Sequence, residues 1–160
     1  MTDHVLVINC GSSSLKFAAI DPISGQAALS GLAERLGSPD ASLNVRQGDA
    51  RQSVSLAQGG HDAAMLAVLQ LLDSSGLSAK LSAVGHRVVH GGERFKSSVR
   101  IDDVVEAEID ACARLAPLHN PANLIGIRTA RACFANLPQV AVFDTAFHQS
   151  MPAHAYLYAI

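Results

Sequence analysis

Short apolar segments alternate with turn residues over the first third of the chain, and this pattern predicts β-strands. Residues 5–8 are uniformly apolar and rich in β-branched side chains, which is typical of a strand buried on both faces. Residues 15–20 follow a Gly-Ser turn and are expected to form its hairpin partner. Further short strands are predicted at 27–36, 42–46 and 51–56. We therefore expect the chain to open with a series of antiparallel strands.

Helical periodicity replaces this pattern after residue 60. Apolar side chains recur at the spacing of one helix face, at Met65, Val68, Leu69 and Leu72, and Gly76 is expected to end this helix. A strand is predicted at 82–90.

Two further helices and a last strand follow. Asp103 and Glu106 resemble a capping box, and Val105, Ile109 and Cys112 share one face of the helix that it would begin. Asn120 is the expected N-cap of the next helix, with Pro121 at its first position and an end near Ala135. The strand from Gln139 to Phe143 ends at Asp144. Because antiparallel strands come first and crossover units later, the order predicts one mixed α/β sheet with helices packed on it.

Composition narrows the class of protein. The chain has 160 residues, 49% hydrophobic and 16% charged, which suits one domain with a substantial core and argues against disorder. A net charge of −2 gives no electrostatic indication of nucleic-acid binding. No apolar run approaches the roughly 20 residues of a membrane span, and no basic segment precedes the first strand, so we expect neither membrane association nor a signal peptide. The three scattered cysteines fit reduced thiols and a cytoplasmic location.

The loop between the first two strands carries the strongest chemical signal. Residues 9–16 read Asn9-Cys10-Gly11-Ser12-Ser13-Ser14-Leu15-Lys16, and they supply an amide, three hydroxyls and an ammonium group. Such a loop can bind an anion such as phosphate, and a plain hairpin turn with a surface lysine is the alternative interpretation of the same residues. It is not a P-loop, because Phe17 follows the lysine and the surrounding pattern is that of strands.

Arg87 lies within an apolar strand and therefore needs a partner for its charge. A carboxylate or phosphate in a cleft would serve, since guanidinium binds both in bidentate fashion, and a surface ion pair is the alternative. Val89 shares the strand face of Arg87 and would place an apolar contact beside it. This pair suits a small carboxylate that carries a short alkyl group.

Two more positions carry candidate chemistry. His119 follows Leu118 at a predicted helix start, where it could donate to phosphate or serve only as a cap. Asp144 ends an apolar strand, where α/β folds often place functional residues. Its carboxylate could hold Mg²⁺, orient a substrate, act as a base, or merely cap the next turn.

Taken together, four segments resemble the acetate kinase family, which also includes propionate and butyrate kinases. They are residues 7–16, 85–92, 116–121 and 142–148, with a softer match at 31–37, and they run in order along the whole chain. The resemblance implies a ribonuclease-H-like lobe of the actin/sugar-kinase/Hsp70 superfamily. It also implies Mg²⁺-dependent, reversible transfer of the ATP γ-phosphoryl group to acetate, giving acetyl phosphate and ADP, with Mn²⁺ as a possible substitute.

The resemblance assigns roles to individual residues. Asn9 matches a position that helps hold the metal, and Asp144 matches the essential acid. Arg87 matches the arginine that binds the carboxylate or the transferring phosphoryl group. A further set matches residues that contact the phosphates of ATP: Ser12, Ser14, Lys16 and His119. Val89 and Leu118 match the small apolar pocket for the methyl group of acetate, the methyl pocket.

The family resemblance would continue into a second lobe that residues 1–160 do not contain. We therefore expect residues 1–150 to form an N-terminal lobe, residues 151–160 to begin the connection to the second lobe, and the chain to have little kinase activity by itself. The complete enzyme is expected to be a homodimer. Acetate and propionate remain alternative substrates, and a non-catalytic lobe that binds an anion or a partner remains the alternative function.

Overall fold

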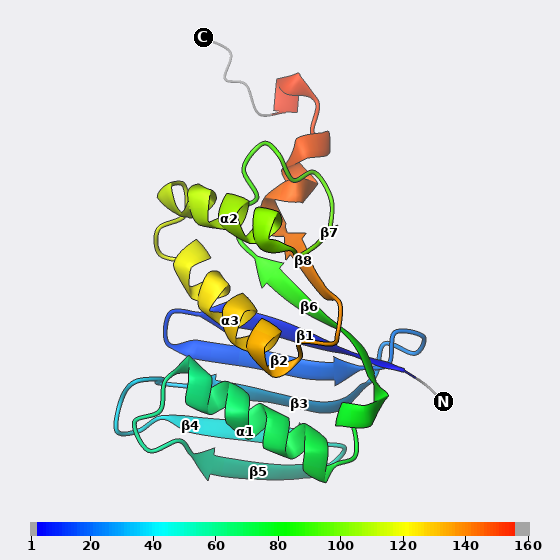
Figure 1. Cartoon of the computed structure of the whole chain (residues 1–160), viewed down its shortest axis with the longest axis vertical. Helices are drawn as coiled ribbons and strands as arrows, with labels where there is room; N and C mark the ends of the chain where they lie inside the picture. Colours follow the sequence, from blue (N-terminus) through cyan, green and yellow to red (C-terminus); the bar gives the residue numbers. More distant parts are fainter. Residues whose placement is uncertain (1–2, 156–160) are drawn as a thin grey trace.

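Eight strands form one mixed sheet in the computed structural model, which describes residues 3–155 (Figure 1). Their order across the sheet is β5-β4-β3-β2-β1-β6-β8-β7. The strands are β1 (His4–Gly11), β2 (Ser14–Ile20), β3 (Ala27–Glu34), β4 (Ser42–Gln47), β5 (Ala50–Ser55), β6 (Leu81–Val88), β7 (Val99–Arg100) and β8 (Gln139–Phe143). The five N-terminal strands pair antiparallel with their neighbours, whereas β1, β6 and β8 run parallel. The predicted series of antiparallel strands and the predicted mixed sheet are both confirmed.

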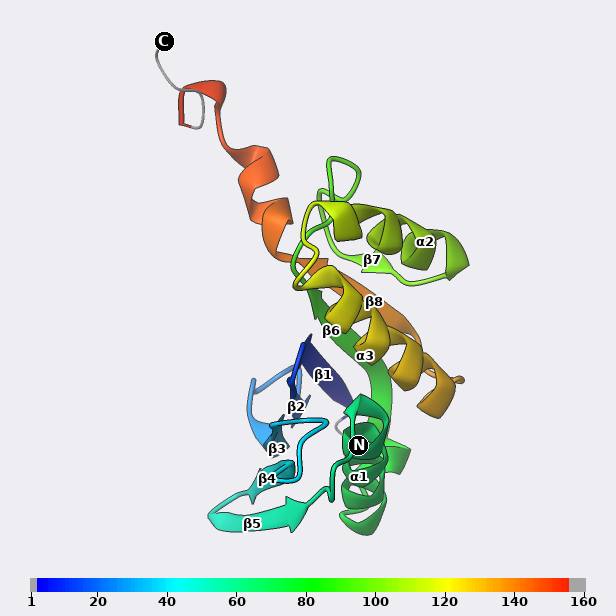
Figure 2. The same cartoon turned by 90° about the vertical axis from the view of Figure 1, so that its left-hand side faces the viewer.

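The helices α1 (His61–Ser74), α2 (Asp103–Ala111) and α3 (Asn120–Cys133) all lie on the same side of the molecule (Figure 2). α1 contacts β2 and α3, while α3 contacts β1, β6 and α2. Gly76 ends the α1 segment with φ of 68°, as its position after the apolar periodicity predicted. One face of the sheet is thus covered by helices. Within residues 3–155 no helix covers the other face, which we call the open face.

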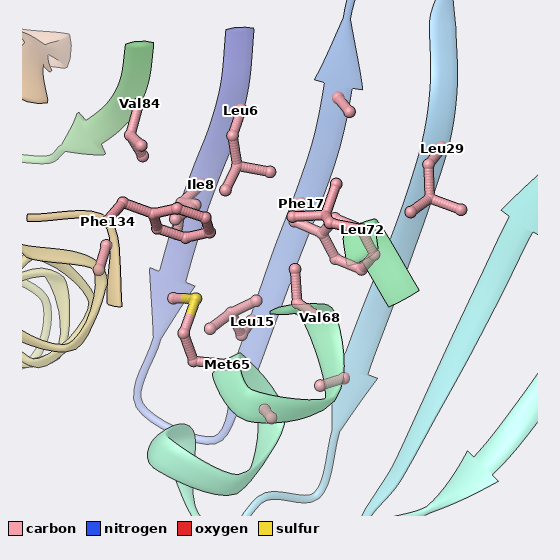
Figure 3. Close-up of a cluster of buried hydrophobic side chains, with 14 of the residues drawn as sticks. Leu6, Ile8, Leu15, Phe17, Leu29, Met65, Val68, Leu72, Val84 and Phe134 are labelled. Atoms are coloured by element: carbon pink, nitrogen blue, oxygen red, sulfur yellow. The ribbon is translucent and has the colours of Figure 1, made fainter. Parts of the chain in front are cut away.

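The core lies between this helical layer and the central strands. Alternate side chains of β1 and β2 point into it, among them Leu6, Ile8, Leu15 and Phe17 (Figure 3). Met65, Val68 and Leu72 of α1 pack against them, so the helical periodicity correctly identified the buried face. Lys16, which lies between two buried residues of β2, faces the open side as the strand period predicted.

A glycine lets α3 approach β1 closely. A Cβ atom on Gly126 would lie 2.6 Å from Cβ of Cys10, so no larger residue fits there without a backbone shift. Burial raises the pKa of the Cys10 thiol to about 11, which keeps it protonated and unreactive at neutral pH. Cys10 is therefore a packing residue within the candidate phosphate loop.

Charged side chains join α2 to α3 at the surface. Glu106 accepts hydrogen bonds from Arg128 at 2.6 Å and from Arg131 at 2.5 Å, and Asp103 and Asp110 bind the same two arginines. Burial alone would raise the pKa of Glu106, but the two arginines outweigh it and lower that pKa below its ordinary value. The carboxylate form of Glu106 thus stabilises the folded chain.

The lowered pKa of Glu106 predicts a loss of stability in acid. Its contribution is complete above the ordinary glutamate pKa near 4.5 and is lost as the pH falls through the lower folded-state value. We expect Glu106→Gln to reduce the free energy of unfolding at pH 7 by about 1 kcal/mol. Urea denaturation between pH 7 and pH 3 should show a smaller decline for the variant than for the wild type. If the free energy of unfolding of the variant fell with pH as steeply as that of the wild type, Glu106 would not be a source of the acid sensitivity.

Three of the differences from the predicted boundaries have a clear physical cause. Asp102, not Asp103, caps α2: its backbone is extended and its carboxylate accepts from the N–H of Val105 at 2.8 Å. His119, not Asn120, occupies the N-cap of α3, because the Asn120 side chain is turned inward to bind other backbone groups. β6 ends at Val88, two residues earlier than predicted, since the chain beyond it bonds to side chains of α3.

Two 3₁₀ segments, Asp144–Ser150 and Ala153–Ala155, lead away from the sheet (Figure 2). Residues 156–160, in the predicted connecting segment, lie outside the described residues. Among residues 3–155, no helix is long and apolar enough to cross a membrane.

Candidate active site

Four of the predicted residues form a row across the open face of the sheet, at one end of its central strands. Asn9 of β1 lies directly opposite Lys16 of β2. On the other side of β1, the parallel register pairs Ile8 with His86, which places Arg87 beside Asn9. Asp144 follows the last residue of β8, next to the end of β6. We call Lys16, Asn9, Arg87 and Asp144 the site row.

Arg87 forms hydrogen bonds with two other members of the site row, Asp144 and Asn9. Its Nε donates to Asp144 Oδ1 at 3.1 Å and Oδ2 at 3.0 Å, and its Nη2 donates to Oδ2 at 2.5 Å. Its Nη1 donates to Asn9 Oδ1 at 3.3 Å. The hydrogen bonds to Asp144 raise the pKa of the Arg87 guanidinium above its ordinary value, although burial opposes this. The charge partner that Arg87 required is therefore the Asp144 carboxylate.

Both members of this ion pair remain accessible. The side chains of Arg87 and Asp144 are 45% and 43% exposed. A small anion or a metal ion can thus reach either group from solvent, and an incoming charge can exchange for the existing partner. A pair with this exposure contributes little to folding stability, which is consistent with a role in binding.

The loop that joins β1 to β2 is fixed through its carbonyl groups. The Gly11 carbonyl oxygen lies 2.7 Å from His61 Nε2, and the Ser13 carbonyl accepts from the N–H of Leu36 at 3.0 Å. Among residues 3–155, the Ser12 and Ser14 hydroxyls form no hydrogen bond, and Ser12 is exposed. The loop thus has a fixed backbone with hydroxyl groups available to a ligand, as an anion-binding loop requires.

Two buried asparagines of α3 position the segment that follows β6. Asn123 donates to the Cys10 carbonyl at 2.7 Å and accepts from the N–H of Val89 at 3.0 Å. Asn120 accepts from the N–H of His90 at 3.1 Å and donates to the carbonyl of the same residue at 2.9 Å. Asn123 therefore ties the end of β1 to the segment after β6, and Asn120 ties that segment to α3 and α2. The sequence prediction missed both functions.

Further polar contacts support the neighbouring strand ends. Thr145 accepts from the N–H of Gly91 at 3.0 Å, which ties the residue after Asp144 to the segment after β6. His86 is buried and lies 2.7 Å from Gln139 Oε1. Burial lowers the pKa of His86, which keeps its imidazole neutral, although the hydrogen bond to Gln139 opposes this. Thus His86 is a structural residue of the sheet.

The predicted methyl-pocket residues and His119 lie outside the site row. Val89 is half-buried just beyond β6, whereas Leu118 is 77% exposed before α3. His119 is exposed at the N-cap of α3, and it forms no side-chain hydrogen bond there. Within the described residues, neither Leu118 nor His119 has a side-chain bond to the site row. Their predicted contacts with substrate stay predictions.

The site row offers oxygen ligands of the kind that Mg²⁺ prefers. The Asn9 amide oxygen and the Asp144 carboxylate both accept from the Arg87 guanidinium, so both lie beside the same side chain. Among residues 3–155, no cluster of three or more His, Cys, Asp or Glu side chains could form a cage around a metal. Mg²⁺ commonly takes one or two protein oxygens and completes its shell with phosphates and water, so this donor set fits it.

Comparison with known proteins agrees with this geometry. Residues 4–160 match the profile of the acetokinase family. The chain is 53% identical over 160 residues to acetate kinase from Chromobacterium violaceum, and 54% identical over 155 residues to acetate kinase from Deinococcus radiodurans. These alignments cover 100% and 97% of the chain but 40% and 39% of the relatives, respectively. The chain therefore spans about 40% of the length of the curated relatives that it matches.

Solved structures show the same fold. A propionate kinase from Francisella tularensis superposes with a TM-score of 0.93 at 43% identity, covering 99% of this chain and 41% of that one. Acetate kinase from Porphyromonas gingivalis gives a TM-score of 0.91 at 39% identity, with the same coverage. The predicted ribonuclease-H-like fold is thereby confirmed. By the profile match, the extent of identity and the shared architecture, the chain belongs to the acetokinase family.

Proposed function

We propose that this chain forms part of an acetate kinase, in which its site row takes part in Mg²⁺-dependent transfer of the ATP γ-phosphoryl group to acetate. The observation that carries this proposal is the site row itself. It places an ammonium, an amide, a guanidinium and a carboxylate side by side on an open sheet face. Phosphoryl transfer depends mainly on positioning and neutralising charge, which is what such a set of groups can do.

Each residue has a role in this proposal. Asn9 and Asp144 would hold Mg²⁺, which would neutralise charge on the phosphate oxygens when it is bound. Arg87 binds the acetate carboxylate or the transferring phosphoryl group. The phosphate contacts come from Ser12, Ser14, Lys16 and His119, and the methyl contacts come from Val89 and Leu118.

The reaction needs no strong base. An acetate oxygen attacks the γ-phosphorus, the bond from that phosphorus to the β–γ bridging oxygen breaks, and ADP leaves with the bond electrons. The attacking carboxylate is already ionised at pH 7. Asp144 therefore orients groups and holds the metal, without accepting a proton.

Several finer features belong to the same proposal. Mn²⁺ would replace Mg²⁺ because both accept hard oxygen ligands. The active protein would be a cytoplasmic homodimer. Propionate is the second candidate substrate, and the structural similarity to a propionate kinase favours it as the alternative. A non-catalytic lobe that binds an anion or a partner would share the same exposed site row.

A chimera tests the proposed activity. Residues 1–160 would replace the aligned segment of Chromobacterium violaceum acetate kinase, to which they are 53% identical. We expect the chimera to form acetyl phosphate from acetate and Mg-ATP, and residues 1–160 alone to show little activity. Propionate in place of acetate separates the two substrates. A folded chimera without acetyl phosphate formation would favour the non-catalytic alternative.

A further inference from the structure

A shallow hollow with cationic and apolar lining lies on the open face of the sheet, among β2, β3, β4 and β5. It has a volume of about 720 Å³, and its lining includes Lys16, Ser30, Leu32, Asn44, Arg46 and Arg51. This volume is within the range of small-molecule sites in proteins. Only Lys16 belongs to the site row, and the two arginines lie on strands that contribute nothing to that row.

Strand register explains how the hollow is lined. Ser30, Arg46 and Arg51 are direct cross-strand partners on β3, β4 and β5. Leu32 and Asn44 form the next row, in which Lys16 is the partner on β2. Lys16 and Asn44 are two strands apart, or about 10 Å at the usual strand spacing. The three long cationic side chains can therefore reach a single ligand.

The arrangement of Arg46 and Arg51 destabilises the folded sheet when no anion is bound between them. Like charges directly opposite each other on neighbouring strands are destabilising. Within residues 3–155, neither arginine forms an ion pair, and no carboxylate lines the hollow. The Nε of Arg46 donates to the Gly48 carbonyl at 2.9 Å, which leaves its two Nη groups available. A bound anion would supply the negative charge that these two guanidinium groups lack.

We propose that this hollow, which shares only Lys16 with the site row, binds a phosphate ester. The two guanidinium groups and Lys16 would bind the phosphate oxygens, because arginine recognises phosphate in bidentate fashion. Ser30 and Asn44 supply further hydrogen-bonding groups. Leu32 is half-buried among these polar groups and offers an apolar contact for the organic part of the ester. The proposal rests on charge and register within β2–β5 and does not depend on the proposed kinase activity.

Titration of residues 1–160 with phenyl phosphate, inorganic phosphate and pyrophosphate would test this proposal. Backbone amide shifts in NMR spectra would locate each anion, and calorimetry would give its affinity. We expect phenyl phosphate to bind more tightly than inorganic phosphate and to shift amides of β3, β4 and β5. Arg51→Gln should weaken binding about tenfold, the loss typical of one charge-assisted contact. The Arg46→Gln/Arg51→Gln double variant should weaken it about a hundredfold if the two contacts add.

A charge reversal gives an independent readout. Arg51→Glu would place opposite charges across β4 and β5, so it should abolish binding while raising the thermal stability of the unliganded chain. Lys80→Gln is the matched control, since it removes one exposed positive charge that does not line the hollow. Equal affinities in wild type and the Arg51 variants, or shifts confined to residues 11–14, would overturn the proposal. Equal binding of phenyl and inorganic phosphate would overturn the ester assignment.

Discussion

Asp144→Asn should reduce kcat/KM of the chimeric enzyme by about a thousandfold, equivalent to roughly 4 kcal/mol of transition-state stabilisation. The amide keeps the shape and one acceptor oxygen of the carboxylate, but it carries no charge. It can neither neutralise Arg87, whose Nε and Nη2 it would face, nor hold Mg²⁺ with the same strength. Acetyl phosphate formation at saturating Mg-ATP would measure the loss.

We expect Asp144→Asn to change the free energy of unfolding only slightly. Because the Arg87 and Asp144 side chains are both nearly half exposed, the pair is worth no more than about 1 kcal/mol of stability. Asp110→Asn is the matched control: it also removes an exposed carboxylate that binds an arginine, Arg128 at 3.3 Å, but it lies on α2. The control should retain full activity. Near-normal turnover by Asp144→Asn in an active chimera would show that this carboxylate is not essential.

The fold was largely predictable because its strands and helices have distinct hydrophobic periods. Residues 5–8 of β1 are an unbroken apolar run, and α1 repeats its apolar side chains at helical spacing, so both elements were placed correctly. Local sequence did not distinguish Asp102 from Asp103 as the cap of α2, since both carboxylates can accept from a helix start. β7 has two residues and owes its pairing to β8, so no periodic signal could reveal it.

The site was predictable only where its chemistry is unusual for its position. Arg87 was identified because a charge within an apolar strand needs a partner, and Asp144 because it ends such a strand. Thr145 and His61 gave no comparable signal, since their partners are backbone groups of distant segments. Asn123 gave a weak sequence signal. It is a polar residue three positions after Asn120, on a face of α3 that is buried in the structure.

Asn123→Ala should destabilise the chain by about 2–4 kcal/mol. The substitution removes the amide that forms two hydrogen bonds at once, leaving the Cys10 carbonyl and the Val89 N–H without their partner in or beside the core. Each buried group left unsatisfied costs about 1–3 kcal/mol. Urea denaturation of residues 1–160 at pH 7 would measure the change in the free energy of unfolding.

Asn44→Ala is the control for the loss of an asparagine side chain. Its amide donates to Glu34 at 3.5 Å on the solvent-exposed side of the sheet, so we expect a change within about 0.5 kcal/mol. If Asn123→Ala were as mild as this control, the two hydrogen bonds would not be what fixes the end of β1 to the segment after β6. In the chimera the same substitution should lower kcat while the protein remains folded, because the Asn9 and Arg87 strand ends would lose their common support. Unchanged kcat in a destabilised but folded variant would instead limit Asn123 to a structural role.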